Sequence, residues 1–288
     1  MGKNRQLSAD FDIQRRSELY DTAAQVITSL LFDYGVDCLA LGEFTSDDIL
    51  EINRRTNLQG YRYLGNPEKQ GRLVFDTAVL FKESELSYVA DEVLIGPRGN
   101  SQLRLAHQIS FQSDAQLPEI YLYVVHWSSR IWVPENDPRR DTMGYRLQDE
   151  LRKTADGIQS DFYGLVLGDF NDEPFNTSLS AHLLATRDRT LAAKNNTYLY
   201  NPFWRMLGEF EPYPSASYGG THYNKNGVDS KWSTLDQLVC SSAFLTPGGW
   251  ELNETNIEII TPDPLGQMVP DRKQLVDHFP IIGEIESK

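Results

Sequence analysis

The 288-residue chain has little cysteine and no long apolar run. Its two cysteines, Cys38 and Cys240, are too few for a disulfide framework or an all-thiolate zinc site. Both lie in apolar segments, as is typical of small buried thiols in core strands. No run approaches the roughly 20 apolar residues of a membrane-spanning helix, and segment 1–16 lacks the apolar centre of a signal peptide. We therefore expect a cytoplasmic protein without a membrane span.

The chain also lacks an excess of basic residues. It has 27 Lys and Arg against 41 Asp and Glu, a formal net charge of -14. Proteins that hold duplex DNA through its phosphates usually present a basic surface, so tight nonspecific binding to nucleic acid is disfavoured. A nuclease is not excluded, because a metal ion or a local basic patch can supply positive charge. The candidates for such a patch are Arg130, Arg139, Arg140 and Arg146.

With 40% hydrophobic residues and no internal repeat or linker, the chain is expected to form a single domain over residues 1–288. Helical spacing of apolar residues predicts helices over residues 17–33 and 142–158. The almost wholly apolar segment 36–41 is typical of a strand covered on both faces. Short alternating runs over residues 73–111 predict antiparallel strands. The order of these elements predicts an α/β sandwich of two packed, mostly antiparallel sheets flanked by helices.

Acidic and histidine residues recur at what the sequence indicates are the C-terminal ends of apolar strands. Because strand ends that meet at one rim are where such folds place their chemistry, these positions become candidates for a site. They are Glu43, His126, Asp169 and Asp236.

The most informative local motif is Gly168-Asp169-Phe170-Asn171-Asp172, which follows an apolar strand. On an extended chain, Asp169 and Asn171 point the same way. The carboxylate can bind a cation or accept a proton, and the amide can donate to a phosphate oxygen. A simple polar turn is the alternative, because Gly, Asp and Asn all favour turns.

The other candidates have equally simple alternatives. Glu43 ends an apolar strand, where a cation would offset its charge unless the strand end is solvated. His126 follows two valines and could be a core histidine with one hydrogen bond. Asp236 is flanked by strand residues and calls for a partner such as an imidazole. The adjacent Asp277 and His278 could be a ligand and a charge-stabilising imidazole, or an ordinary polar loop.

Taken together and in this order, the motifs resemble the endonuclease/exonuclease/phosphatase superfamily, which includes deoxyribonuclease I-like enzymes. GDFND and VDHFP are the most specific parts of a resemblance that covers nearly the whole chain. It implies a four-layered α/β sandwich and a catalytic Mg²⁺ or Mn²⁺. By this resemblance Glu43 binds the metal, with Asp277 as a further carboxylate. Asp169 orients or deprotonates the attacking water or helps to bind the metal.

The resemblance also assigns the residues that contact phosphate. Asn171 holds the scissile phosphate, and His278 contacts it as charge develops, oriented by Asp236. His126 contacts phosphate or acts as a general acid, and a histidine at its place is typical of the deoxyribonuclease and sphingomyelinase branches. These groups suit the chemistry, because a cation and fixed donors stabilise the highly charged transition state.

One part of the family pattern is missing. Members begin with a strand that ends in an asparagine near the metal, whereas no apolar strand precedes the first predicted helix here. Asn4 is the only asparagine before Glu43 and has no strand to carry it. We therefore expect the first strand to be missing.

The leading functional hypothesis is a divalent-metal-dependent hydrolase of phosphodiester bonds, with DNA or RNA as substrate. The alternative is a phosphatase or phosphodiesterase acting on a small-molecule or lipid head-group phosphate, and the acidic charge favours it. A non-catalytic binding module on the same fold is the third. The aromatic-rich segment 213–232, with Trp204, could stack bases or pack its own surface. The oligomeric state is not predicted.

Overall fold

The computed structural model describes residues 16–65, 73, 75–208, 219–228, 230–270 and 276–288. Its largest sheet has seven strands, and both faces of its centre are buried. Within it, β6–β7 and β8–β9 pair in parallel and the other neighbours are antiparallel. In spatial order the strands are β4 (Ser87–Arg98), β5 (Ser101–Gln112), β6 (Ile120–His126), β7 (Tyr163–Asp169), β12 (Asp236–Cys240), β9 (Leu199–Tyr200) and β8 (Ala185–Thr186).

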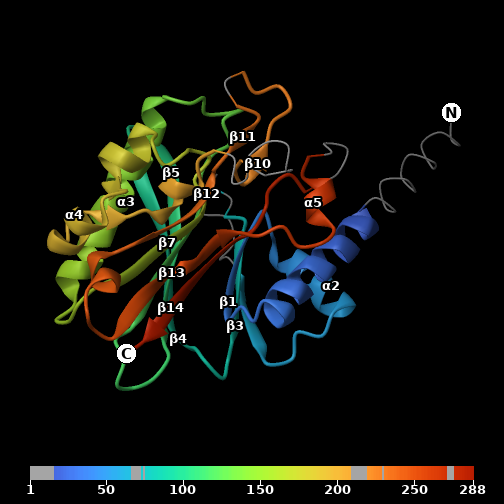
Figure 1. Cartoon of the computed structure of the whole chain (residues 1–288), viewed down its shortest axis with the longest axis horizontal. Helices are drawn as coiled ribbons and strands as arrows, with labels where there is room; N and C mark the ends of the chain where they lie inside the picture. The colour runs from blue at the N-terminus through green and yellow to red at the C-terminus, as the bar shows by residue number, and fades with distance from the viewer. Residues whose placement is uncertain (1–15, 66–72, 74, 209–218, 229, 271–275) are drawn as a thin grey trace, which may run out of the picture.

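A second layer of strands packs against one face of the large sheet (Figure 1). It consists of a three-stranded sheet and a two-stranded sheet, both antiparallel. The first has the order β1 (Cys38–Gly42), β3 (Thr77–Lys82), β2 (Tyr61–Gly65), and the second pairs β13 (Trp250–Ile259) with β14 (Ile281–Ser287).

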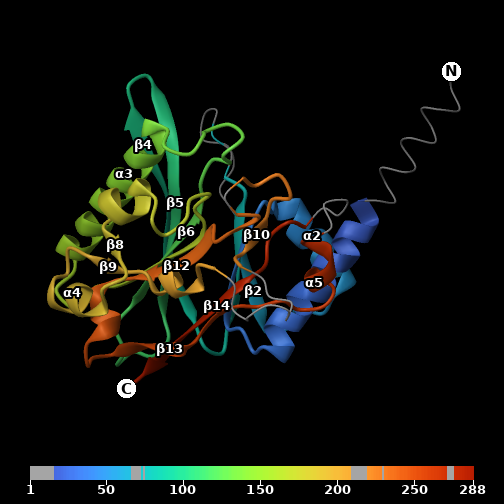
Figure 2. The same cartoon turned by 45° about the horizontal axis from the view of Figure 1, so that its top comes forward.

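Helices cover the outer face of each layer, as Figures 1 and 2 show. On the large sheet lie α3 (Pro138–Gly157), α4 (Arg189–Lys194) and the π-helical turn η2 (Ser178–His182). On the other side lie helix 16–28, which continues as η1 (Ser29–Asp33), with α2 (Ser46–Arg55) and α5 (Leu265–Met268). The predicted four-layered α/β sandwich is confirmed. The shorter elements are the 3₁₀ turns η3 (Pro202–Met206) and η4 (Ser242–Leu245) and the hairpin of β10 (His222–Tyr223) and β11 (Trp232–Ser233).

The central strands are apolar without interruption because both of their faces are covered. In β6, Leu122 and Val124 enter the core between the sheets, while Tyr123 and Val125 pack under α3. A strand buried on both faces reads as a continuous apolar run rather than an alternating one. This is why the segment leading to His126 consists almost entirely of apolar and aromatic residues.

Strand β1 is less buried than its sequence predicts. Its residues from Cys38 to Leu41 are half-buried, and β3 is its only paired neighbour among the described residues. The expectation of two buried thiols is correct for Cys240, whereas Cys38 is half-buried. No described strand precedes helix 16–28, and Asn4 lies outside the described residues.

Helix α3 begins four residues before the predicted start at Thr142. Asp137 caps it by accepting a hydrogen bond from the backbone N–H of Arg139, and Pro138 occupies the first turn. The apolar periodicity on which the prediction rests starts only at Met143, so the charged first turn resembles a loop.

No helix in the described ranges combines the length and apolarity needed to cross a membrane.

Candidate functional site

Three candidate residues form one row across neighbouring strands. Asp236 pairs in register with Asp169, and Asp169 pairs in register with His126. Adjacent strands lie about 4.8 Å apart, so these side chains are necessarily close. The prediction that Asp236 ends a strand is wrong, since it is the first residue of β12. It still reaches the same rim, because β12 runs antiparallel to β7 and its start lies beside the end of β7.

The facing sheet adds two carboxylates at this rim. Gly42 at the end of β1 pairs with Thr77 at the start of β3. Glu43 therefore follows β1 at the level where Asp76 precedes β3. Our sequence reasoning considered only the ends of strands and missed Asp76. The signal was an acidic residue directly before an apolar strand that pairs antiparallel with the strand before Glu43.

Asp76 and His126 form the first carboxylate–imidazole pair. His126 Nδ1 lies 2.9 Å from Asp76 Oδ1, and Arg104 makes an ion pair with the same carboxylate. Burial lowers the pKa of His126, but the bond to Asp76 and its charge outweigh burial and raise that pKa. Its Nε2 points between two carboxylates, at 3.9 Å from Glu43 Oε1 and 4.0 Å from Asp169 Oδ2.

Asp236 and His278 form the second pair, with 2.7 Å between His278 Nδ1 and Asp236 Oδ2. Thr221 holds both sides of it in place. Its hydroxyl oxygen accepts from the backbone N–H of Asp236, and its carbonyl accepts from Phe279 N–H. Burial lowers the pKa of His278, but the charge of Asp236, its hydrogen bond and the charge of Asp169 raise it to about 10. The pKa of Asp236 is correspondingly lowered despite burial.

Asp169 lies between the two pairs, and its side chain is only 15% exposed. Burial, and to a lesser extent the nearby Asp236 charge, raise its pKa to about 6, although both imidazoles oppose the shift. Asn171 donates to its carboxylate from the backbone N–H at 2.6 Å and from Nδ2 at 2.5 Å. Asn171 Nδ2 also donates to the carbonyl of Trp127.

The expected reason for the closeness of Asp169 and Asn171 is wrong, although the two residues do meet. Asn171 has φ 52°, so the chain turns there instead of continuing extended. Gly168 begins this turn with φ 126°, and a Cβ at that position would lie 2.2 Å from the carbonyl oxygen of Val125. Only glycine allows this approach of β7 to β6 and this φ together.

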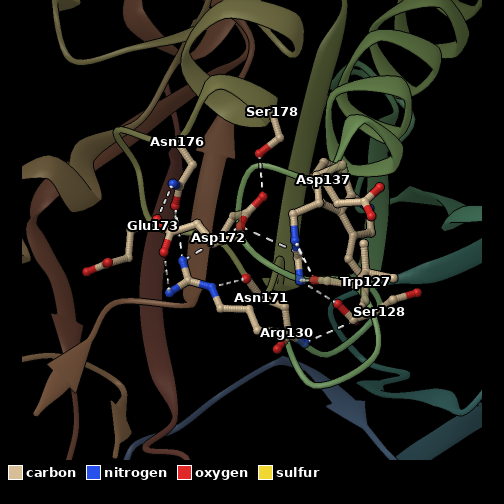
Figure 3. Close-up of polar contacts among 12 residues, drawn as sticks. Trp127, Ser128, Arg130, Asp137, Asn171, Asp172, Glu173, Asn176 and Ser178 are labelled. Atoms are coloured by element: carbon tan, nitrogen blue, oxygen red, sulfur yellow. Dashed lines mark hydrogen bonds and ion pairs between the residues drawn. The ribbon is translucent and has the colours of Figure 1, made fainter. Parts of the chain in front are cut away.

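A network of mostly buried charged side chains contacts the backbone of this turn (Figure 3). The Asp172 side chain is 1% exposed and accepts a 2.5 Å hydrogen bond from the Ser178 hydroxyl. Arg140 and Arg130 lie 3.5 Å and 3.6 Å from its other oxygen. Arg130 also donates to the backbone carbonyl of Asn171 at 2.8 Å. The network fixes the backbone on which Asp169 and Asn171 lie.

Of the four arginines predicted as a basic patch, Arg130 alone lines the site. Arg140 is buried in the network just described. Arg139 is bound to Asp137, and Arg146 lies on α3 at 3.6 Å from Asp149. These positions do not form the patch that duplex binding would need.

A cavity of about 840 Å³ joins these groups. Helix 16–28 contributes Arg16 and Tyr20 to its wall, and the segment after β6 contributes Arg130 and Ile131. The structure brings every site residue proposed from the sequence to the lining of this one cavity: Glu43, His126, Asp169, Asn171, Asp236, Asp277 and His278.

Of the two alternatives for the aromatic segment, base stacking or packing on its own surface, the described residues show packing within the protein. Trp204 lies under the guanidinium of Arg187, 5.2 Å from its ring centre. Trp232 stacks on Phe279 at 5.6 Å. Tyr213 lies outside the described residues.

The donors around the cavity suit a divalent cation. Among the described residues, Asp169, Asp236 and His278 bring ligand atoms within 4.8 Å of one another, and so do His222, Asp277 and His278. Glu43 and Asp169 also lie about 4 Å from the same imidazole nitrogen, His126 Nε2. Carboxylate oxygens are the ligands that Mg²⁺ and Mn²⁺ prefer. His222 was missed because it lies in a glycine-rich segment with no clear strand pattern.

Comparison with solved structures finds this fold in proteins of low sequence identity. Zebrafish (D. rerio) TDP2 complexed with single-strand DNA product has a TM-score of 0.62 and 14% identity, covering 93% of each chain. A mannosyl-6-phosphatase from Bacteroides thetaiotaomicron has 0.59 and 13%, covering 94% of this chain and 91% of that one. The human Nocturnin catalytic domain with bound sulfate has 0.57 and 15%, covering 93% and 87%.

At such identities the likeness establishes the fold alone. No functionally curated protein is significantly similar to this chain. The sequence profile of one family, however, matches residues 6–268, most of the chain. The chain therefore belongs to the endonuclease/exonuclease/phosphatase family, whose members are phosphoesterase hydrolases that generally use divalent metals.

Proposed function

We propose that this chain is a divalent-metal-dependent phosphoesterase that hydrolyses its substrate in the cavity around Asp169. The observation that carries the proposal is the placement of Asp169 between two carboxylate–imidazole pairs, Asp76–His126 and Asp236–His278. Each pair orients a ring by its Nδ1 and leaves Nε2 for other partners. A structural role for one such pair would be unremarkable, but two facing one carboxylate in one cavity form a catalytic arrangement.

In this proposal Asp169 accepts the proton of the attacking water. Its pKa of about 6 leaves it ionised at neutral pH but basic enough to receive a proton. His278, with its pKa raised to about 10, stays protonated and donates to a phosphate oxygen as charge develops. His126 donates from Nε2 on the opposite side, with Asp76 holding its ring.

Glu43 and Asp169 are the residues that would hold the divalent ion, with Asp277 as a further carboxylate. When bound, such an ion offsets the negative charge of the phosphate and of the leaving oxygen. Asn171 keeps the Asp169 carboxylate oriented through its two hydrogen bonds and shapes the floor on which the phosphate rests.

Nucleic acid is the first substrate to test, because the His126 branch of the family resemblance favours it and TDP2 was solved with a single-strand DNA product. A small phosphate ester is the second candidate, and one specific observation favours it. The Lys and Arg side chains described at the cavity are Arg16 and Arg130, which offers little to neutralise a long polyanion. A compact ester or a strand end fits better than the interior of a duplex.

A turnover panel tests the proposal. Plasmid DNA, single-stranded DNA, RNA and small phosphate mono- and diesters are each incubated with the protein and Mg²⁺ or Mn²⁺, with EDTA as the control. We expect cleavage of at least one class that EDTA abolishes and Asp169→Ala removes. Absence of any metal-dependent cleavage across the panel would instead favour a non-catalytic binding module.

A further inference from the structure

The fold places a second histidine beside His278, in a position that the proposed hydrolysis does not use. His222 on β10 and His278 before β14 form an isolated antiparallel β-bridge. Residues directly opposite in such a bridge present their side chains on the same face. The two imidazole rings accordingly lie 4.7 Å apart at 47°, and both line the cavity.

Asp277 completes a set of three donors. Its Oδ2 lies 3.9 Å from His222 Nε2, and ligand atoms of His222, Asp277 and His278 are all within 4.8 Å of one another. Ligands of a tetrahedral zinc site lie about 3.4 Å apart, as follows from bond lengths near 2.0–2.1 Å. The Asp277 side chain is 62% exposed, so its carboxylate can move the short distance that closes the site.

The ring of His278 is already oriented as a metal ligand would be. Its Nδ1 is held by Asp236 at 2.7 Å, which leaves Nε2 as the atom available to a cation. Metal-binding histidines almost always bond a carboxylate or carbonyl through the other ring nitrogen, which fixes the tautomer and raises the basicity. Asp169 and Asp236 add negative charge close to the same ring.

From this geometry we propose that His222, Asp277 and His278 form a site for a transition-metal ion of the Zn²⁺ or Co²⁺ class. Its two imidazoles distinguish it from Glu43 and Asp169, the carboxylates that suit Mg²⁺, and Asp277 lies where it could serve either ion. Two imidazoles and one carboxylate favour a borderline ion over Mg²⁺, which prefers oxygen ligands. Three protein ligands leave a fourth position toward the cavity, open to water or a phosphate oxygen. The site deepens the proposed function and rests on it, because it shares His278: an ion bound at Nε2 would displace the proton from that nitrogen to solvent and would take over its contact with the phosphate oxygen.

Cobalt(II) titration of the metal-free protein tests the site without relying on turnover. Tetrahedral Co²⁺ absorbs strongly in the visible range, and its bound histidines give shifted imidazole N–H signals in proton NMR. We expect saturation at one such ion per chain, with two shifted N–H signals. His222→Asn should weaken binding by more than about tenfold and remove one signal, because even the loss of an outer partner costs a metal site 10–100-fold.

Two variants separate this proposal from its alternatives. His182→Asn removes a histidine 3.6 Å from Asp141 that has no place in the site, and the cobalt spectrum should not change. Glu43→Gln should also keep the cobalt spectrum while losing Mg²⁺-supported cleavage. Wild-type protein that hydrolyses nothing but still shows the two signals would overturn only the proposed function. Unchanged cobalt affinity in a His222→Asn protein with normal circular dichroism would overturn the site.

Discussion

The environment that would make Asp169 a base also lowers the stability of the folded protein. Its pKa is raised from 3.8 to about 6, because burial and Asp236 disfavour its charge. A raised carboxyl pKa means that the folded state loses stability as pH rises from about 4 through about 6, and does not regain it above that pH. A residue chosen for folding alone would not carry this cost.

Asp169→Asn should therefore stabilise the metal-free protein while removing its turnover. The shift corresponds to about 3 kcal/mol, and the net gain should be nearer 1–2 kcal/mol because the amide offers Asn171 one acceptor oxygen instead of two. Thermal unfolding in EDTA checks this: the variant should melt higher at pH 8, with the difference fading by pH 4. A variant with a lower melting temperature than the wild type at pH 8 would show that the ionised Asp169 carboxylate does not destabilise the fold.

Asp236 sets the charge of His278, which predicts a pH profile. In the wild type, kcat/KM should fall as His278 loses its proton near pH 10, and the acid limb set by Asp169 should lie at or below pH 6, because a bound cation lowers the pKa of that carboxyl. Asp236→Asn removes the largest influence that opposes burial, so the pKa of His278 should fall, although Asp169 and Asp277 still raise it. The alkaline limb of the profile should therefore move to lower pH. An unmoved limb would mean that another group controls it.

The site residues differ in how visible they are in the sequence. Asp169, Asp277 and His278 stand in short polar motifs beside apolar strands, so local pattern is sufficient to find them. Asp76 and His222 reach the site through pairing with residues 50 and 56 positions away (His126 − Asp76, His278 − His222). Such partners depend on strand register, which a single sequence does not specify.

Among the elements, the turn after β7 depends most strongly on a glycine, at position 168. Gly168→Ala should destabilise the protein by about 2–4 kcal/mol, because it combines an unfavourable φ with a clash against the Val125 carbonyl. Gly157→Ala at the end of α3 is the matched control: nothing lies within 4 Å of its Cβ position, and its effect should stay within about 1 kcal/mol. Urea unfolding of both variants compares them, and equal stabilities would contradict the turn's special geometry.

The two adjacent arginines at the start of α3 offer a second matched comparison. Arg140→Ala leaves the buried Asp172 with Arg130 as its remaining ion-pair partner and should cost about 3 kcal/mol. Arg139→Ala breaks a partly exposed pair with Asp137 and should cost at most about 1 kcal/mol. Chemical denaturation gives both values. Similar losses of unfolding free energy in the two variants would mean that the ion pairs of Asp172 do not stabilise the turn.

Element types were more predictable than their ends and directions. The apolar segments before His126 and Asp169 are strands as expected, since burial on both faces leaves a clear pattern. The start of α3 was missed because its charged first turn is held by a cap and a proline rather than by apolar packing. The turn at Asn171 was one of two alternatives in the sequence, and the local pattern could not decide between them because the turn depends on the contact between Gly168 and a neighbouring strand.

At the scale of the whole molecule, the acidic charge limits how the substrate is held. The net charge is -14, and the Lys and Arg side chains described at the cavity are Arg16 and Arg130. If one or two phosphate contacts dominate, log(KM) should rise with log[salt] with a slope of about 1–2 for any nucleic-acid substrate. A slope near 5 or above would reveal an extended basic surface and point to an interior duplex site.

The central claim is that Asp169 and its two flanking pairs form a hydrolytic centre. Its most direct test is the steady-state rate on the best substrate of the panel, measured with Mg²⁺ for the wild type and for Asp169→Ala. The account predicts a fall of at least about 10³-fold in kcat for the variant, and loss of the wild-type rate in EDTA. An Asp169→Ala rate within tenfold of the wild type would contradict it.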